Sequence, residues 1–185
     1  GADNFTVADS GNCGITIRSG GSAQANIYFS DGTSGANEYT GIIQYLHDVN
    51  AMSFGVNNGV ERMRIDSSGR MLIGKSSALS GGDPSDARLQ IVGRASAATD
   101  LARFALARGN AAANLGSGAE LGKIYFSDNA GATFASIAGI VDGATGSNDY
   151  PGRLTFATTA NSASSPTERL TVFSTGEIKA KGIYD

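Results

Sequence analysis

The chain has 185 residues, with 14 Lys and Arg against 17 Asp and Glu, and its formal net charge is −3. This length predicts one domain or two small ones, and the mild acidity argues against a nucleic-acid binder, which normally carries a basic patch. No apolar run approaches the ~18 residues that a transmembrane helix needs, so we expect no membrane insertion. Cys13 is the one cysteine, which excludes an intrachain disulfide and any zinc site built from several cysteines.

The supply of bulky apolar side chains is small. Leu, Ile, Val and Phe together provide 38 residues, whereas Gly alone provides 26 and Trp is absent. That share is close to the level below which chains are often disordered, but the low net charge argues against simple disorder. The composition therefore predicts short strands, tight turns and a thin core. Other copies of the chain could complete such a core, because oligomerisation replaces missing burial within one chain.

In chain order, short strands are predicted first over residues 5–7, 15–17 and 27–29. Residues 61–65 alternate apolar and charged side chains, the turn 67–69 follows, and an apolar face resumes over residues 71–73. This alternation is typical of a half-buried strand, and glycine at the turn tolerates a positive φ.

The second half of the chain repeats these signals. Strands are predicted over residues 89–91, 124–126, 170–172 and 178–180, with turns at 150–152 and 174–176. Residues 99–108 contain good helix formers, but they align with the β-branched residues 15–17. We therefore predict a strand there, because tertiary context often overrides helix propensity.

An internal repeat organises these elements. Residues 27–31 and 124–128 are both IYFSD, and residues 61–63 (ERM) match residues 168–170 (ERL). The order of the matched elements is kept, and the second copy has longer connections. We interpret the chain as two tandem all-β units, residues 1–80 and 81–185. The boundary lies in the polar segment 80–85, which is rich in Gly and Ser and contains Pro84.

Several phrases resemble the repeats of bacteriophage tail fibre proteins that are common in viruses of marine bacteria and cyanobacteria. They are residues 26–31, 61–69, 151–160 and 163–170. Residues 179–185 resemble the junction just before the intramolecular chaperone domain of such fibres, whose own catalytic motif is absent here.

The resemblance implies an intertwined homotrimeric β fibre on the virion, used to attach to the bacterial host surface. The implied partners are two further copies of the chain, a cell-surface glycan or protein receptor, and other tail proteins. No cofactor and no metal are expected, and no enzymatic activity is expected of this segment. Two alternatives stay open, a tailspike-type enzyme that degrades glycans and a purely structural shaft.

Receptor contacts are expected where aromatic rings lie beside amide, carboxylate or imidazole groups in loops, where binding residues concentrate. The loop 142–151 is the first choice, and residues 45–48 are the second. The candidate contact residues are Tyr39, Tyr45, His47, Asn148, Asp149 and Tyr150. Tyr28 and Tyr125 hold the same place in the two matched segments, and we interpret them as structural.

Catalytic and metal sites have weaker signals. His47, the one histidine, has no serine in a Gly-x-Ser-x-Gly pattern to activate, so we interpret it as a solvated or hydrogen-bonded residue at a strand end. Acidic residues are scattered singly, whereas a glycosidase needs a pair. Asp31 and Asp128 follow matching strands and are interpreted as turn residues rather than as cation ligands.

Overall fold

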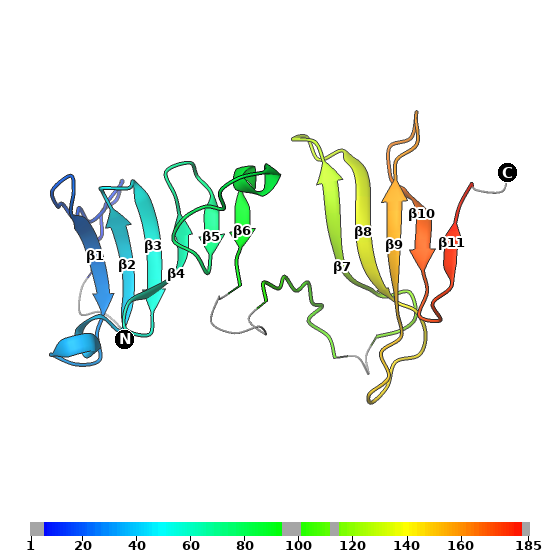
Figure 1. Ribbon diagram of the computed structural model, residues 1–185, viewed down its shortest axis with the longest axis horizontal. Coiled ribbons are helices and arrows are strands. Elements are labelled where there is room, and N and C mark those ends of the chain that lie inside the picture. The colour runs from blue at the N-terminus through cyan, green and yellow to red at the C-terminus, as the bar shows by residue number, and fades with distance from the viewer. Residues whose placement is uncertain (1–5, 94–100, 112–114, 183–185) are drawn as a thin grey trace. The chain divides into compact units, whose positions relative to one another are not determined.

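The computed structural model describes residues 6–93, 101–111 and 115–182. The chain divides into two compact units, Gly1–Phe104 and Ala105–Asp185, and each is described by itself. The described residues form eleven strands in two sheets and no α-helix (Figure 1), so the protein is all-β, as the sequence predicts. Two short 3-10 helices occur in these ranges, and neither has the length or apolar character needed to cross a membrane.

The first unit is a six-stranded sheet with the strands in sequence order. Its strands are β1 (Gln24–Phe29), β2 (Gly41–Leu46), β3 (Ala51–Val56), β4 (Val60–Ile65), β5 (Met71–Ile73) and β6 (Leu89–Ile91), with the 3-10 helices η1 (Gly35–Tyr39) and η2 (Asp83–Asp86) between strands. Neighbouring strands from β1 to β5 are antiparallel, and β6 lies parallel to β5.

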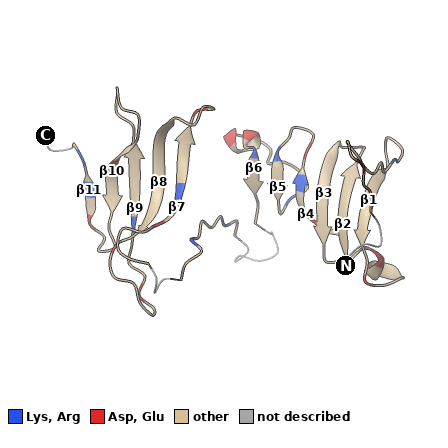
Figure 2. Ribbon diagram, turned by 180° about the vertical axis from the view of Figure 1, so that it is seen from behind, with Lys and Arg blue, Asp and Glu red and all other residues tan. Residues whose placement is uncertain are grey.

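The second unit is a five-stranded antiparallel sheet, again in sequence order. Its strands are β7 (Glu120–Ser127), β8 (Thr133–Val141), β9 (Gly152–Thr158), β10 (Thr167–Val172) and β11 (Ile178–Ala180). The matched sequence pairs occupy equivalent strands, since the segment IYFSD begins in the last residues of β1 in one unit and of β7 in the other and continues into the turn that follows. β1–β5 and β7–β11 therefore have the same order and the same antiparallel pairing. Figure 2 shows that β1, β2, β3 and β8 carry no charged residue.

The predicted turns between the last antiparallel strands of each unit are confirmed. Gly69 has φ 73° and its N–H donates to the carbonyl of Asp66 at 2.9 Å. Gly176 has φ 85° and its N–H donates to the carbonyl of Phe173 at 2.9 Å. A side chain would be strained at both positions, which is why glycine closes these turns.

The boundary between the units lies further along the chain than residue 80. β6 belongs to the first sheet because Leu89 pairs with Met71 and Ile91 pairs with Ile73. Gln90 is 3% exposed, and its amide donates to the carbonyls of Pro84, Ser85 and Ala87. Those bonds fasten the crossover to β6, and parallel neighbours require a crossover of about a dozen residues or more.

The predicted strand over residues 99–108 is wrong in its described part. Residues 101–108 form neither strand nor helix, and Thr99 and Asp100 lie outside the described residues. The segment contacts the edge strand β7 through side chains instead. Arg108 Nη1 donates to the carbonyl of Glu120 at 3.1 Å, and a Cβ built on Gly122 would lie 2.7 Å from Leu106 Cβ.

The predicted strand at residues 15–17 is also wrong. These residues have no regular structure, and Ile15 is 65% exposed. Of the predicted strand 5–7, Thr6 and Val7 are irregular and Phe5 lies outside the described residues, as do residues 183–185 at the proposed chaperone junction.

The core of each unit is thin, as the composition predicts. Among the described residues, five apolar side chains are buried, and they are Leu46, Ala51, Leu72, Ala138 and Val141. Each sheet therefore has too few buried apolar groups to be covered on both sides by its own chain.

Candidate functional site

One face of the first sheet is apolar from edge to edge. The strand registers place six apolar residues in one cross-strand row, which is Ile27, Ile43, Phe54, Met63, Ile73 and Ile91. The adjacent row is Ala25, Tyr45, Met52, Ile65, Met71 and Leu89. Alternate residues of a strand point to the same side, so the two rows form one surface, which we call the apolar face of the first unit.

This apolar face is open in the single chain. Ile27 is 47% exposed and Leu89 is 48% exposed, whereas Leu72, on the opposite face, is 1% exposed. Soluble monomers rarely expose large contiguous apolar patches, and such patches mark interaction surfaces. The apolar face is therefore the strongest candidate interface of this unit.

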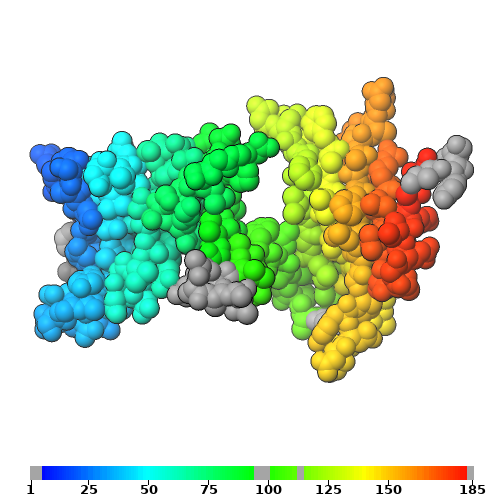
Figure 3. Space-filling model, viewed as in Figure 1, coloured from blue at the N-terminus to red at the C-terminus, as the bar shows by residue number. Residues whose placement is uncertain are grey.

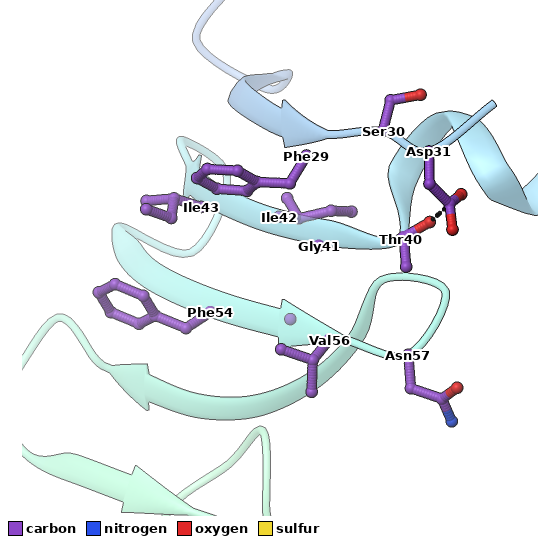
Figure 4. A pocket seen from close by; sticks show the side chains of 11 residues that line it. Phe29, Ser30, Asp31, Thr40, Gly41, Ile42, Ile43, Phe54, Val56 and Asn57 are labelled. Carbon is purple, nitrogen blue, oxygen red and sulfur yellow. Dashed lines mark hydrogen bonds between the residues drawn. The ribbon is translucent and has the colours of Figure 1, made fainter. Parts of the chain in front are cut away.

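A hollow lies at one end of the apolar face, where Gly41 separates Phe29 from Val56 in the register (Figure 4). Its volume is about 580 Å³, and the rings of Phe29 and Phe54 contribute to its wall. A Cβ on Gly41 would lie 3.3 Å from the Cβ of Phe29, so the glycine both permits this pairing and leaves the hollow empty of side chain. At its rim, Thr40 Oγ1 donates to Asp31 Oδ1 at 2.9 Å.

The second sheet has an equivalent apolar face. Its first row is Ile124, Ile137, Phe156, Leu170 and Ala180, and its adjacent row is Gly122, Gly139, Leu154, Val172 and Ile178. Ile124 is 44% exposed and Phe126, beyond the first row, is 53% exposed. Each unit thus has an uncharged apolar surface built from the same strand positions.

The opposite faces carry the polar groups of the sheets. In the first unit Arg64 makes two hydrogen bonds to Glu61, at 2.8 and 2.7 Å, and this carboxylate raises the pKa of Arg64. In the second unit Lys123 Nζ lies 2.5 Å from Glu120 Oε2, and this hydrogen bond raises the pKa of Lys123. Charge is therefore kept off the apolar face in both units.

Two of the candidate receptor residues in the first unit come together. Tyr45 lies in β2 and His47 follows it, with ring centroids 4.9 Å apart and planes at 74°. Tyr45 Oη also donates to Asn50 Oδ1 at 2.7 Å. The Tyr45 side chain belongs to the apolar face, so it stands at the margin of that surface and is only partly exposed.

Tyr39 is not part of this group. It ends η1, beyond the opposite end of β2, and is 39% exposed. Its ring lies beside the β3–β4 turn, where a Cβ on Gly59 would be 3.4 Å from Tyr39 Cδ2. The three candidates of the first unit thus do not form one site.

The other three candidates lie on the β8–β9 loop of the second unit, which extends past the strand ends (Figures 1 and 3). Gly146 and Asp149 exchange backbone hydrogen bonds at 3.0 and 3.4 Å, and Asn148 between them has φ 58°. Tyr150 is 68% exposed. The loop therefore presents Asn148, Asp149 and Tyr150 to solvent in a folded turn.

The base of this loop is fixed by Asp142. Its carboxylate accepts hydrogen bonds from the backbone N–H of Ser174 at 2.9 Å and from Arg153 Nη1 at 2.9 Å. The hydrogen bond from the Ser174 backbone, which has the larger effect, and the one from Arg153 both lower the pKa of Asp142. The loop ends are thus held to β9 and to the turn after β10, and within the loop Thr145 Oγ1 donates to the carbonyl of Leu115 at 2.9 Å.

Asp128, one of the two acidic residues interpreted as turn residues, has that role in the structure. Asp128 Oδ1 accepts hydrogen bonds from the backbone N–H groups of Ala130 and Ala132, at 3.0 and 2.9 Å, as an Asx-type turn requires. In the part of the chain that the structure describes, no three His, Cys, Asp or Glu side chains gather in a way that could hold a metal ion.

Sequence reasoning missed two surfaces. The open apolar faces follow from alternation, but alternation alone does not say which face the rest of the chain leaves uncovered. Tyr28 and Tyr125, interpreted as structural, are 52% and 59% exposed. Both lie opposite the apolar faces, and their exposure is a feature that the matched sequence segments did not reveal.

No protein-family model matches this chain. A search of curated proteins found no match either.

Solved structures that are similar to the chain include the following two. Both contain the carboxy-terminal domain of the L-shaped tail fibre of bacteriophage T5, one of them with its intramolecular chaperone domain. Each is 12% identical in sequence with a TM-score of 0.37, over 98% of this chain. The chain spans 63% of the structure that includes the chaperone domain and 91% of the other.

Proposed function

We propose that this chain is a segment of a bacteriophage tail fibre of the type found in viruses of marine bacteria and cyanobacteria. In this proposal it assembles as a homotrimer on the virion, joins other tail proteins and helps to attach the particle to a bacterial surface. It acts by binding and not by catalysis. The observation that carries the proposal is the open apolar face of each sheet, together with the sequence resemblance.

The apolar faces favour further copies of this chain as their cover. Both faces are uncharged and have the same strand positions, so a rod built from copies in parallel would bring like surfaces together along its length. A ring of three copies closes without leaving a free patch, and the number three comes from the family that the sequence resembles. In such a rod the side chains of Ile27 and Ile124 face the shared core.

The attachment role is supported by what the trimer would leave outside. The loop carrying Asn148, Asp149 and Tyr150 is exposed and held at its base, and loops of this kind on a rigid sheet can vary without disturbing the core. Three copies of one loop would also strengthen weak contacts through avidity.

Sedimentation of the purified chain tests the assembly. We expect a trimer at micromolar concentration, and a stable monomer there would overturn the proposal. Adsorption of the trimer to a panel of marine bacteria and cyanobacteria tests attachment, and release of soluble oligosaccharide from the cells would indicate the alternative enzyme. A trimer that adsorbs to no strain in a panel containing the phage's own host would indicate a structural shaft.

A further inference from the structure

The opposite face of the second unit is hollowed beside Tyr125. The hollow has a volume of about 250 Å³, and its lining includes residues from β7, β8, β9 and β10. The residues of the apolar face, such as Ile124 and Phe156, take no part in it. The hollow is therefore separate from the surface that we assign to trimer assembly.

The floor of the hollow consists of four small residues on the two central strands. They are Ser136 and Ala138 of β8 and Thr155 and Ala157 of β9. Ser136 is 6% exposed and Thr155 is 5% exposed. No hydrogen bond joins either hydroxyl to another described residue, and neither oxygen is among the fully buried unpaired side-chain atoms. Both hydroxyls are therefore open to the hollow and can pair with polar groups that enter it.

The walls supply an aromatic ring and a carboxylate. Tyr125 is 59% exposed, and the ammonium of Lys123 lies 5.4 Å from its ring centroid. Across the floor, Glu168 Oε1 accepts a hydrogen bond from Thr171 Oγ1 at 2.5 Å. The second oxygen of Glu168 makes no hydrogen bond within the described ranges. One wall is thus the ring of Tyr125 with the Lys123 ammonium beside it, and the other is an acceptor.

The first unit offers a matched comparison within the same chain. Tyr28 holds the position of Tyr125, but the register places Gln44 and Arg64 where the second unit has Ala138 and Thr171. Gln44 Nε2 donates to Ser53 Oγ at 2.8 Å, and Arg64 is held by Glu61. The long side chains of Gln44 and Arg64 therefore occupy the space beside Tyr28 in the first unit. In the second unit the smaller side chains of Ala138 and Thr171 leave the space beside Tyr125 open.

We propose that this hollow binds a neutral hexose unit of a cell-surface polysaccharide. A pyranose ring has one face of C–H groups, which fits against the exposed ring of Tyr125, and an edge of hydroxyls, which can pair with Ser136, Thr155 and Glu168. The hollow is lined by one ammonium, Lys123, and by the carboxylate of Glu168. Lys123 is already paired with Glu120, so the uncompensated charge is that of Glu168, and it disfavours an acidic sugar. A strand-like peptide is disfavoured because the floor of the hollow lies on β8 and β9, whose backbones are already paired with strands on both sides and offer no free edge for strand addition.

The inference rests on the proposed function, since the trimer places this face outside and the host surface supplies the sugar. A hollow of this size is smaller than pockets that enclose a drug-sized ligand, so it would hold one or two units of a longer chain. Three copies on one fibre would then bind the repeating polysaccharide together.

Saturation-transfer NMR with mannohexaose, maltohexaose and cellohexaose tests the site. We expect the wild-type trimer to transfer signal to at least one of these probes. Tyr125→Ala is expected to weaken that binding about tenfold or more, which corresponds to ~1.4 kcal/mol, whereas Tyr125→Phe should keep it. Ala138→Gln, which copies Gln44 of the first unit, is expected to block the hollow.

Tyr28→Ala is the matched control, because it removes an equally exposed ring from the filled counterpart, and it should bind as the wild type does. The proposal is overturned if the wild type binds none of the three probes, or if Tyr28→Ala and Tyr125→Ala have equal effects. Sedimentation of each variant distinguishes a failure of the proposed trimer from a failure of the proposed sugar site. A trimer that adsorbs to host cells without binding sugar in this hollow removes the site and leaves the fibre function intact.

Discussion

Replacing Phe29 by Ser is the most direct perturbation of the proposed trimer. Phe29 lies at the end of β1 on the apolar face and is 57% exposed in the single chain (Figure 4). Burying a Phe side chain fully contributes ~1.5–3 kcal/mol, so covering the exposed part contributes roughly 1–2 kcal/mol per chain. Three copies give about 3–5 kcal/mol per trimer, which predicts a rise of at least ~10²-fold in the dissociation constant.

Tyr28→Ser is the control for this change. Tyr28 is the preceding residue of the same strand and is 52% exposed, but it points to the opposite face. Both variants remove an aromatic ring from β1 and lose a similar amount of strand propensity, so a difference between them reports which face is covered by other copies.

Sedimentation equilibrium over a range of chain concentrations measures the effect, with circular dichroism to verify that each variant is folded. We expect Phe29→Ser to shift towards monomer at concentrations where Tyr28→Ser and the wild type remain trimeric. Equal dissociation of the two variants, or no effect of either, would refute the assignment of the apolar face to the trimer core.

Three further predictions concern the loop, acid stability and the resistance of the trimer. Replacing both Asp149 and Tyr150 by Ala should reduce adsorption to host cells while the trimer stays intact, and unchanged adsorption would discard this loop as the receptor site. The lowered pKa values of Asp66 and Asp142 mean that their stabilising effect is present above the unfolded-state pKa of ~3.9 and is lost as the pH falls through the folded-state values. The free energy of unfolding measured in urea should therefore decrease below about pH 4. The variant Asp142→Asn should be less stable than the wild type at neutral pH, and its stability should change less as the pH falls. On an SDS gel the unheated protein should migrate as a trimer and the boiled protein as a monomer, because intertwined strands separate slowly; identical monomer bands would argue against intertwining.

Acid sensitivity at Asp66 follows from opposing effects. Partial burial disfavours its charged form, but hydrogen bonds from the backbone N–H and guanidinium of Arg70 and from the N–H of Ser68 outweigh burial and lower the pKa. The carboxylate therefore adds most to the stability of the β4–β5 turn while it is ionised, and the backbone hydrogen bonds of Asp66 and Gly69 close the turn as well.

The strands that alternate over a short range could be predicted from sequence. Met63 and Ile65 in β4, and Leu170 and Val172 in β10, share a face because each pair is two residues apart. The turns after these strands followed from glycine at the position of positive φ. Local chemistry determines both features, so no knowledge of distant contacts was needed.

Features that depend on distant contacts could not be predicted in this way. β6 was expected as a strand, but its parallel partner β5 lies across a crossover that is held by the buried amide of Gln90. The sequence of residues 101–108 is compatible with a regular element, because apolar side chains recur along it. In the structure the segment instead packs against the edge of β7 through Leu106 and Arg108. Pairing partners of this kind are set by the whole sheet and not by the segment.

The candidate sites were predictable to different degrees for the same reason. The exposed tip at Asn148, Asp149 and Tyr150 was indicated by its polar, turn-forming sequence, whereas the role of Tyr125 depends on which side chains stand beside it in register. That register joins residues from four strands, and single-segment reasoning gave only the identity of Tyr125 with Tyr28.

The two units differ where a receptor would act and agree where copies would pack. On the apolar faces, Ile27 and Ile124 hold the same register position, and Ile43 and Phe54 correspond to Ile137 and Phe156. On the opposite faces, the long side chains of the first unit give way to small ones in the second. In the proposed trimer, packing among copies would constrain the first surface, because a polar group buried there without a partner costs free energy. The outer surface would be free of that constraint, so the proposed assembly does not explain the open hollow beside Tyr125.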